Sequence, residues 1–307
     1  MCYSAEVKAD YRYYVETFNV AINLKEFAKL FWRRLDDGTW VPKIPRAMEA
    51  PFLNPKTDEE REIKDAIDRF RDQQAMRLEQ SIFKQTKRKA DAERTLQTKT
   101  TKKAQEDLRI STKKIGEDKR RLENLRRTEA KRSDSRIWPG DQVLILVAEH
   151  GKRVLRPMRY FCRMPGWTAE VERNYDGTYN ARRDRLETSW KKLFGHQHGL
   201  MVADRFYESV AGKDGKSVEL EFEPRTGEPM LIACLWAYDP VDDLYSCAAI
   251  TDDPEPEVAA AGHDRTIINI KPEHIDAWLT PEPGNLAAMY AIFDDKRHPY
   301  YEHRLAA

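Results

Sequence analysis

One long stretch without proline limits the possible folds of this chain more than any other feature. Between Thr57 and Arg132 the sequence holds no proline and a single glycine, Gly116. Its first residues, Thr57-Asp58-Glu59-Glu60, fit the capping box that opens many helices, with a threonine followed three residues later by a glutamate. The apolar residues that follow recur at helical spacing in a narrow stripe, at Ile63, Ile67, Phe70, Leu78, Ile82, Ala104, Leu108, Ile115, Leu122 and Leu125. The stretch is therefore predicted to be helical.

A single helix over this stretch would extend about 115 Å at 1.5 Å per residue. The polar, threonine-rich segment from Thr95 to Thr101 suits a turn, so the sequence predicts a hairpin of two antiparallel helices, each about half that length. We assign residues 57–132 to this hairpin, and residues 1–56 with 133–307 to a separate body. The narrow stripe favours a charged coiled coil that serves as a spacer or dimerisation arm. Direct contact with nucleic acid through a basic face is the alternative.

Charge is divided unevenly between these two parts. The whole chain has 53 Lys and Arg against 52 Asp and Glu, a net charge of +1. Residues 57–132 hold 23 basic and 16 acidic side chains, a net +7, which leaves the body with 30 against 36, a net −6. A basic arm on a mildly acidic body indicates a polyanionic partner near the arm.

Short apolar segments separated by turn residues predict a body of many strands and few helices. Strands are expected at residues 143–147, 154–162, 200–207, 217–222, 230–237, 245–251 and 266–270, and helices at 23–35, 184–193, 272–279 and 285–292. The segment from Tyr11 to Ile22 is expected to be strand or turn, and His150-Gly151-Lys152 and Lys213-Asp214-Gly215-Lys216 to be hairpin turns. Because strands and helices do not alternate regularly, the fold class is α+β with a mostly antiparallel sheet.

Composition and cysteine usage exclude several classes of protein. No apolar run approaches the ~20 residues of a membrane-spanning helix. The polar start lacks the basic and apolar regions of a signal peptide, so we expect a cytoplasmic protein. The four cysteines, at positions 2, 162, 234 and 247, form no Cys-x-x-Cys pair, so we expect neither disulfides nor structural zinc, and the last three should be buried. His196-Gln197-His198 has no acidic or cysteine ligand beside it and is expected to be a solvated turn.

The first two residues indicate a reactive terminus. Methionine aminopeptidase generally removes Met1 ahead of a side chain as small as that of Cys2, which would leave an α-amine and a thiol on one carbon. Their reference pKa values, about 7.7–8.0 and about 8.5, keep a useful fraction of each nucleophilic near neutral pH. Such a 1,2-aminothiol condenses with an aldehyde to an imine, and the thiolate then closes a five-membered thiazolidine ring. The alternative is an accidental cysteine on a frayed terminus.

Three later motifs contain the residue types that this chemistry requires. They are Asn180-Ala181-Arg182, Phe206-Tyr207-Glu208 and Gly262-His263-Asp264-Arg265. Imine and thiazolidine formation need a base for the ammonium, an acid for the departing water and a hydrogen-bonding group that orients the amine. Glutamate, histidine and asparagine suit these roles. Each motif taken alone fits an ordinary strand end or loop equally well.

Together with Met1-Cys2, these motifs resemble the SOS response-associated peptidase (SRAP) family, whose members sense abasic sites in single-stranded DNA. The family signatures Pro-x-Trp, Asn-Ala-Arg-x-Glu, aromatic-aromatic-Glu and His-Asp/Asn-Arg are matched in this order by Pro165-Gly166-Trp167, Asn180-Ala181-Arg182-Arg183-Asp184, Phe206-Tyr207-Glu208 and His263-Asp264-Arg265. The resemblance covers the first few residues and roughly Pro139 to Leu279. It implies a barrel-like SRAP fold.

The resemblance also implies a DNA-crosslinking enzyme that needs no cofactor or metal and that works at the nucleoid. Cys2 would attack the open-chain aldehyde of an abasic deoxyribose, and the resulting thiazolidine crosslink would protect the lesion in the response to DNA damage. Asn180 would hold the amine of Cys2, and Glu208 would shuttle protons. His263 would assist ring opening and reversal of the crosslink.

Three further positions would bind the DNA strand by the same resemblance. Arg182 and Arg265 match family positions that contact phosphates, a role that suits a planar guanidinium. Trp167 matches an aromatic position near the lesion, where an aromatic ring can stack on a neighbouring base.

The sequence departs from the family mainly at positions expected to bind DNA. The family usually continues Cys-Gly-Arg, whereas Tyr3 and Ser4 follow Cys2 here, so a phosphate-binding arginine is missing. Asp184 replaces the usual glutamate, Ser209 the usual tryptophan, and Thr266-Ile267 the usual Met-Pro. The long hairpin is also foreign to the family pattern, and its basic side chains could bind phosphate in place of the arginine that is missing at Ser4.

Two other functions fit the same residues. One is an N-terminal-cysteine peptidase or amidase, which the family's name records as a proposed activity. The other is a non-catalytic interaction protein that works through its helical hairpin.

Overall fold

The computed structural model describes residues 3–36, 40–212 and 215–306 of the 307-residue chain. The chain separates into two compact units. The first comprises Met1–Arg61 and Arg132–Ala307, and the second comprises Glu62–Lys131.

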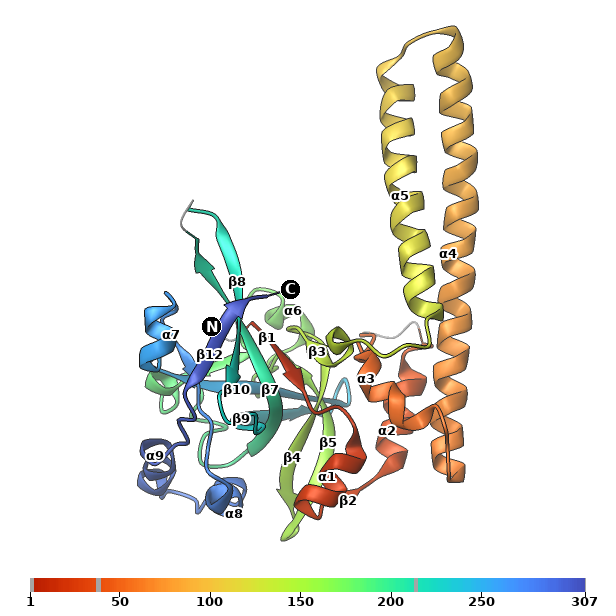
Figure 1. The fold of residues 1–307 in the computed structure, drawn as a ribbon. Coiled ribbons are helices and arrows are strands. Elements are labelled where there is room, and N and C mark those ends of the chain that lie inside the picture. Colours follow the sequence, from red (N-terminus) through yellow and green to blue (C-terminus); the bar gives the residue numbers. More distant parts are fainter. Residues whose placement is uncertain (1–2, 37–39, 213–214, 307) are drawn as a thin grey trace. The chain divides into compact units, whose positions relative to one another are not determined.

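A sheet of 12 strands forms the centre of the first unit (Figure 1). The strands are β1 (Ser4–Val7), β2 (Ala21–Ile22), β3 (Arg136–Ile137), β4 (Gln142–Glu149), β5 (Lys152–Tyr160), β6 (Asn180–Arg182), β7 (His198–Ala211), β8 (Ser217–Pro224), β9 (Met230–Asp239), β10 (Leu244–Asp252), β11 (Thr266–Ile267) and β12 (Tyr301–Leu305). Among the described strands, only β10 with β5, β10 with β6 and β2 with β5 pair in parallel. The prediction of an α+β fold with a mostly antiparallel sheet is confirmed.

Five of these strands close into a ring. β4 pairs with β5 and β7, β9 pairs with β7 and β10, and β10 pairs with β5. Alternate side chains point into this barrel, including Val143, Ile145 and Val147 of β4, and all three are fully buried. The barrel-like core expected from the family resemblance is therefore present.

The internal cysteines lie in or beside this core. Cys162, Cys234 and Cys247 are buried free thiols, as predicted. Burial raises the pKa of Cys162 and of Cys234 to about 12, so neither forms a thiolate near neutral pH.

The turn between β4 and β5 follows the predicted hairpin chemistry. His150 and Gly151 have φ angles of 49° and 73°. Two consecutive residues with positive φ match the right-handed twist of the flanking strands. Glycine is favoured in such turns because it has no Cβ and adopts a positive φ at little cost. The second expected turn includes Lys213 and Asp214, which lie outside the described residues. The strands on either side of that turn, β7 and β8, pair antiparallel up to Ala211 and Ser217.

Short helices surround the barrel. They are α1 (Tyr11–Phe18), α2 (Leu24–Arg33), α3 (Arg46–Glu49), α6 (Ala169–Glu172), α7 (Pro256–Ala260), α8 (Ile275–Leu279) and α9 (Leu286–Asp294), with 3-10 turns η1 (Ala50–Phe52), η2 (Arg132–Ser135), η3 (Arg183–Arg185) and η4 (Pro272–His274). The side chain of Asn23 caps α2, and that of Asn285 caps α9. These two helices and the pair η4 and α8 confirm three of the predicted helices.

The expectation of strand or turn from Tyr11 to Ile22 was wrong for most of that segment. Asp10 accepts a hydrogen bond from the backbone of Arg12 and begins α1. Tyr14 and Phe18, four residues apart, are buried on one face of this helix, and their spacing satisfies a helix better than a strand. Only β2 at the end of the segment is a strand.

The helix predicted at residues 184–193 is also wrong. The chain forms η3 and then a series of turns, one of which joins the Trp190 amide to the carbonyl of Arg185. Arg183, just ahead of the predicted helix, bonds Asp252 and Asp294. Leu186, Trp190 and Leu193 are nevertheless buried, so turns satisfy the apolar spacing that had predicted a helix. The strand expected at residues 266–270 shortens to β11.

The solvated turn predicted at His196-Gln197-His198 is wrong for His198. This side chain begins β7 and is buried against the ring of Trp278 at a centroid distance of 3.9 Å. Its Nε2 accepts a hydrogen bond from the amide of Gly195, and its Nδ1 donates to the carbonyl of Trp278. Burial lowers the pKa of His198 to about 4, so the imidazole is neutral.

The second unit consists of the predicted helical hairpin. It is formed by α4 (Asp58–Thr98), which begins in the first unit, and α5 (Lys102–Arg126). The capping box is present: the Glu60 amide donates to Thr57 Oγ1 at 3.2 Å, and the Thr57 amide donates to the Glu60 carboxylate at 3.4 Å. The turn falls within the expected segment, but α4 has 41 residues and α5 only 25.

Polar contacts join the two helices of the hairpin. Ser81 donates to Asp118 at 2.7 Å, and Arg88 binds Asp107 at 2.5 Å. This pairing requires an antiparallel arrangement, because later residues of α4 meet earlier residues of α5. Among the described residues, no helix is both long and apolar enough to cross a membrane.

Candidate active site

The first strand of the chain runs beside the strand that carries Glu208. β1 pairs antiparallel with β7, with Ser4 opposite Tyr207 and Glu6 opposite Arg205 (Figure 1). Since Tyr207 immediately precedes Glu208, the described chain begins next to this carboxyl group. Cys2, the predicted nucleophile, lies outside the described residues.

A buried ion cluster holds β1 against its neighbours. The carboxylate of Glu6, only 4% exposed, accepts hydrogen bonds from Arg132 at 2.6 Å, from Arg205 at 2.9 Å and from the Tyr207 hydroxyl. Burial and the bond to Glu6 raise the pKa of Tyr207 to about 12, so the hydroxyl keeps its proton and donates it. Sequence reasoning missed this cluster and assigned Arg132 to the hairpin. The packing of distant strands, rather than any motif, brings these residues together.

A second arginine from the same region lies beside Ser4. The guanidinium of Arg136, on β3, donates to Ser4 Oγ at 3.1 and 2.7 Å and also pairs with Glu219. It lies over the ring of Tyr207, 3.7 Å from the centroid. A guanidinium group therefore lies next to position 4, although the residue at that position is a serine. The pairing of β1 with β3, which the sequence did not predict, brings Arg136 there.

Glu208 and His263 form a direct pair. His263 Nε2 lies 3.1 Å from a carboxyl oxygen of Glu208, and the two side chains are 9% and 2% exposed. The other ring nitrogen of His263 donates to the carbonyl of Arg265 at 2.9 Å, which orients the ring. The structure therefore joins two of the predicted catalytic residues, which are 55 positions apart in the sequence.

Both members of this pair favour their protonated forms. Burial raises the pKa of Glu208, and the hydrogen bond with His263 opposes this only in part. Burial alone would lower the pKa of His263, but the hydrogen bond and charge of Glu208 raise it above its usual value. The pair can therefore both accept a proton and return it.

Asn180 is positioned by a parallel strand pairing. It begins β6, lies opposite Ala249 of β10 and is buried. The hydroxyl of Tyr160 donates to its side-chain oxygen at 3.4 Å. This bond fixes the amide with its oxygen toward Tyr160.

Aromatic rings connect Asn180 with the start of β1. The ring of Tyr3 meets Tyr179, the neighbour of Asn180, edge-on at 6.1 Å, and meets Trp138 at 5.4 Å. Tyr3 is 46% exposed. The bulky residue that departs from the family pattern thus packs between two rings and leaves one side open to solvent.

Arg182 and Arg265 line one pocket of about 400 Å³. Asp184 binds Arg182 through both carboxyl oxygens, at 2.9 and 2.7 Å, and this hydrogen bonding lowers the pKa of Asp184. Arg183, Asp252 and Asp253 also line the pocket, so three arginines face three aspartates. A phosphate would therefore have to compete with carboxylates already present.

Trp167 has a different environment. Its ring stacks on Tyr175 at a centroid distance of 4.2 Å and an interplanar angle of 26°. Within the described part of the chain, no ring contact joins this pair to Tyr3 or Trp138. Tyr175 is half exposed, so the stacked pair offers an aromatic surface to solvent.

Among the described residues, no group of three or more His, Cys, Asp or Glu side chains could hold a metal ion. The pair of Glu208 and His263 offers proton transfer, and the amide of Asn180 offers hydrogen bonding.

Comparison with known proteins identifies a family whose sequence pattern this chain matches. The family described as SOS response associated peptidase (SRAP) matches residues 93–303, about two thirds of the chain. The match begins inside α4 and includes all of the predicted site residues except Cys2. A search of curated proteins found no match.

Three solved structures are similar to parts of this chain. A protein from Bordetella bronchiseptica is 20% identical, with a TM-score of 0.47, and covers 59% of this chain and 90% of its own. A phage-related protein from the same organism is 21% identical, with a TM-score of 0.43, covering 56% and 80%. A protein from Bacteroides thetaiotaomicron is 10% identical, with a TM-score of 0.45, covering 56% and 77%. On the match to residues 93–303, the chain belongs to the SOS response associated peptidase family, whose members are associated with the response to DNA damage.

Proposed function

We propose that this protein forms a covalent crosslink with abasic sites in single-stranded DNA through Cys2. The observation that carries the proposal is the buried pair of Glu208 and His263, which lies beside the strand leading to the N-terminus. Family membership supports a role at damaged DNA. The chemistry then depends on Met1 being removed, so that Cys2 presents both an amine and a thiol.

The proposed reaction balances with the loss of one water. The amine of Cys2 attacks the aldehyde carbon of the open abasic sugar, and the resulting carbinolamine loses water to give an imine. The thiolate then attacks the imine carbon, whose π electrons pass to nitrogen, and nitrogen takes up a proton. Glu208 removes the ammonium proton and returns a proton for the departing water. Asn180 holds the amine, and His263 donates a proton when the ring reopens.

DNA binding in this proposal uses separate groups. Arg182 and Arg265 bind phosphates flanking the lesion, with Arg182 exchanging its bond to Asp184 for a phosphate. Trp167, stacked on Tyr175, supports a neighbouring base. The body of residues 1–56 and 133–307 carries out the reaction, and residues 57–132 form a basic helical insertion.

A crosslinking assay tests the proposal. The purified protein is incubated with a single-stranded oligonucleotide carrying one abasic site, and the products are separated under denaturing conditions. We expect an adduct whose intact mass equals protein plus DNA minus one water. The adduct should be absent with an intact oligonucleotide and with the Cys2→Ala variant. An unchanged adduct from Cys2→Ala would contradict the proposal, because an amine, at the N-terminus or on a lysine, would then form the adduct without the thiol.

The crosslinking assay, run beside an assay with peptide substrates, separates the rival functions. The family's name refers to peptidase activity, and a buried acid–base pair could also assist an N-terminal cysteine in cleaving amides. Turnover of peptide substrates without any DNA adduct would support a peptidase. If the protein shows neither activity but binds a partner through residues 57–132, the result would support an interaction protein.

A further inference from the structure

One face of α4 is turned away from α5, its neighbour in the hairpin (Figure 1). At about 100° per residue, nine residues lie within a stripe about 80° wide along this face. All nine are exposed, namely Asp65, Arg69, Asp72, Met76, Gln80, Phe83, Lys87, Ala90 and Arg94. Ser81 and Arg88, which bind α5, lie on the opposite side of the helix. We call this stripe the outer face of α4.

Two large apolar side chains form the centre of the outer face. Met76 is 59% exposed and Phe83 is 76% exposed. Among the described residues of the hairpin, no other large apolar side chain is exposed. One such side chain alone is ordinary on a protein surface. Two of them, seven residues apart, lie on the same face about two turns from each other and form an apolar pair.

The charges on either side of this apolar pair are placed symmetrically. Asp72 comes four residues before the pair, and Lys87 comes four residues after it. Asp65 comes eleven residues before the pair, and Arg94 comes eleven residues after it. One half of the outer face therefore presents carboxylates where the other half presents cations, at matching distances from the centre.

Such a face is complementary to itself in one orientation. When two copies of α4 lie antiparallel, the acidic half of each meets the basic half of the other, and Met76 of each meets Phe83 of the other. Arg69, the one cation in the acidic half, then lies opposite Ala90 and meets no like charge. A parallel pair in register would instead bring carboxylate against carboxylate and cation against cation, which is unfavourable. Charge therefore selects the antiparallel arrangement.

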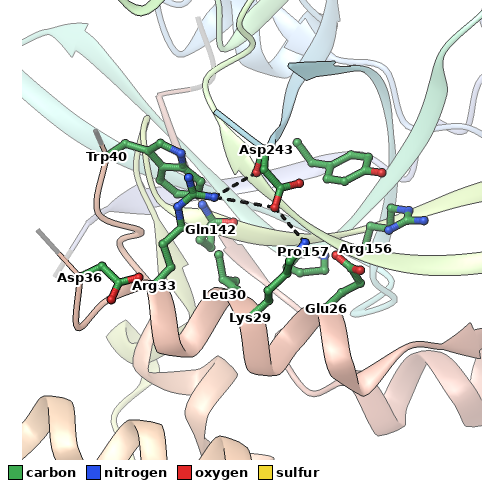
Figure 2. A pocket seen from close by; sticks show the side chains of 11 residues that line it. Glu26, Lys29, Leu30, Arg33, Asp36, Trp40, Gln142, Arg156, Pro157 and Asp243 are labelled. Carbon is green, nitrogen blue, oxygen red and sulfur yellow. Dashed lines mark hydrogen bonds and ion pairs between the residues drawn. The ribbon is translucent and has the colours of Figure 1, made fainter. Parts of the chain in front are cut away.

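The inner charges of the outer face are available for such contacts. Within the described part of the chain, neither Asp72 nor Lys87 makes an ion pair. By contrast, charged side chains that border the pocket in Figure 2 are paired within the first unit: Lys29 binds Asp243 at 2.9 Å, and Arg33 lies 4.0 Å from the same carboxylate. Two opposite charges at symmetric positions, both unpaired, suit a partner that presents the same surface.

We propose that the outer face of α4 is a dimerisation surface and that its partner is the same face in a second copy of this chain. The two helices pack antiparallel about a two-fold axis midway between Met76 and Phe83. These side chains form the apolar centre of the contact. Asp72 of one copy meets Lys87 of the other on each side of that centre. The assembly goes beyond the crosslinking reaction and does not depend on it.

The contact should be reversible and weak. Each copy contributes two large apolar side chains, far fewer than the continuous apolar seam of a stable coiled coil. Arg94 is also bound to Asp91 of its own helix, so its pairing with Asp65 of the other copy adds little. We expect a dissociation constant in the micromolar range.

Sedimentation equilibrium of the full chain at several micromolar concentrations tests the proposal. We expect the average mass to rise from that of the monomer towards that of the dimer. Phe83→Ser should raise the dissociation constant at least about tenfold, because it removes an aromatic side chain at two points of the contact. Val241→Ser, which changes an exposed apolar side chain of the first unit, should leave it unchanged. A monomer at every concentration would overturn the proposal, and so would a dimer that Phe83→Ser does not weaken.

Charge reversal tests the antiparallel arrangement. Asp72→Lys and Lys87→Asp should each raise the dissociation constant about tenfold, because each places like charges together at two points of the dimer. The double variant restores both contacts between opposite charges and should dimerise like the wild type. Circular dichroism checks that every variant remains helical. Failure of the double variant to recover dimerisation would contradict this pairing.

Dimerisation should be independent of the crosslinking site. Cys2→Ala should dimerise like the wild type, so failure of the crosslinking reaction leaves this result unchanged. Binding of single-stranded DNA is measured for the wild type and for Phe83→Ser. If the chain stays monomeric and Phe83→Ser weakens DNA binding, the outer face binds nucleic acid and the proposal is wrong.

Discussion

The carboxyl of Glu208 and the imidazole of His263 hold protons more firmly than the same groups do in water. Burial raises the pKa of Glu208, and the neighbouring carboxylate raises that of His263. A proton can therefore pass between them without changing the net charge of the site. Such a pair suits a reaction that releases one proton from an ammonium and then returns one to a departing hydroxide.

Glu208→Gln should slow crosslink formation by about a hundredfold, within the range that general acid–base groups contribute. Glutamine keeps the shape and can still hydrogen-bond His263, but it cannot carry the proton. Adduct yield against time on denaturing gels, with abasic oligonucleotide in excess, measures the rate. A wild-type rate would assign the proton transfer to another group.

His263→Ala should slow reversal of the crosslink more than its formation. The proposed role of His263 is to protonate the ring when it opens, a step that is needed for reversal. Pre-formed adduct is incubated with excess competing aldehyde, which captures Cys2 once the crosslink has opened, and the release of DNA-free protein is followed over time. Equal effects on both directions would show that His263 only orients Glu208.

His198 should make stability depend on pH. Its folded pKa of about 4 lies below the unfolded value of about 6.5, so the unfolded chain binds a proton first as the pH falls. The neutral His198 side chain contributes to the free energy of unfolding fully above pH 6.5, and this contribution is lost between about pH 6.5 and 4. Its loss should lower the free energy of unfolding by about 2 kcal/mol between pH 7.5 and pH 5.0.

Urea denaturation at these two pH values measures this change, with His198→Phe as the control that lacks a titrating group. His263 acts in the opposite direction, because its pKa is raised and its contribution is lost as the pH rises. The difference between wild type and variant therefore isolates His198. An equal pH dependence in both proteins would contradict the prediction.

At the scale of elements, the site depends on where β1 lies. All four residues of β1 pair with β7 on one side, and two of them also pair with β3 on the other side. The cluster around Glu6 secures this short strand, since Arg132, Arg205 and Tyr207 all donate to one buried carboxylate. The proposed nucleophile precedes β1 by only two residues, so β1 sets the place from which Cys2 must act.

Glu6→Ala should lower the free energy of unfolding by about 2 kcal/mol, because it leaves the Tyr207 hydroxyl without its acceptor and removes one of the two carboxylate partners of Arg132 and of Arg205. It should also reduce the crosslinking rate at temperatures where the variant is still folded. Glu302→Ala removes an exposed partner of Arg225 and should cost under about 1 kcal/mol. Denaturant unfolding and the gel assay compare the two variants. Similar losses from both would show that the cluster does not anchor β1.

At the scale of the whole molecule, the chain combines a barrel-centred unit with a helical hairpin of different charge. Residues 57–132 carry a net charge of +7, while the remainder carries −6. The arginines proposed to bind DNA in the barrel unit face aspartates in the same pocket. A basic hairpin could therefore supply much of the electrostatic attraction to a DNA strand.

Replacing Glu62–Lys131 with a short Gly-Ser linker tests this role of the hairpin. We expect weaker binding to single-stranded DNA and a shallower dependence of log affinity on log salt concentration, by about 0.7 for each phosphate that the hairpin neutralises in the full chain. Fluorescence anisotropy at several salt concentrations gives both slopes, and thermal melting confirms that the shortened chain folds. An unchanged slope would exclude phosphate binding by the hairpin and leave a spacer or dimerisation arm.

Local patterns in the sequence were sufficient to predict many elements. Asn23 and Asn285 cap helices, and His150-Gly151 forms a hairpin turn, because these residues act on their own backbone. The same approach failed at residues 184–193, where the chain forms turns although Leu186, Trp190 and Leu193 are buried. Apolar spacing predicts burial there, and tertiary contacts decide the backbone.

The sequence by itself determined the family, the α+β class, the helical hairpin and the residue types available for chemistry, because motifs, periodicity and capping are properties of adjacent residues. Only the tertiary structure decided that Glu208 meets His263 and that Arg136 lies beside Ser4. These contacts join strands and loops distant in sequence. Their geometry depends on how the barrel closes, which no local pattern contains.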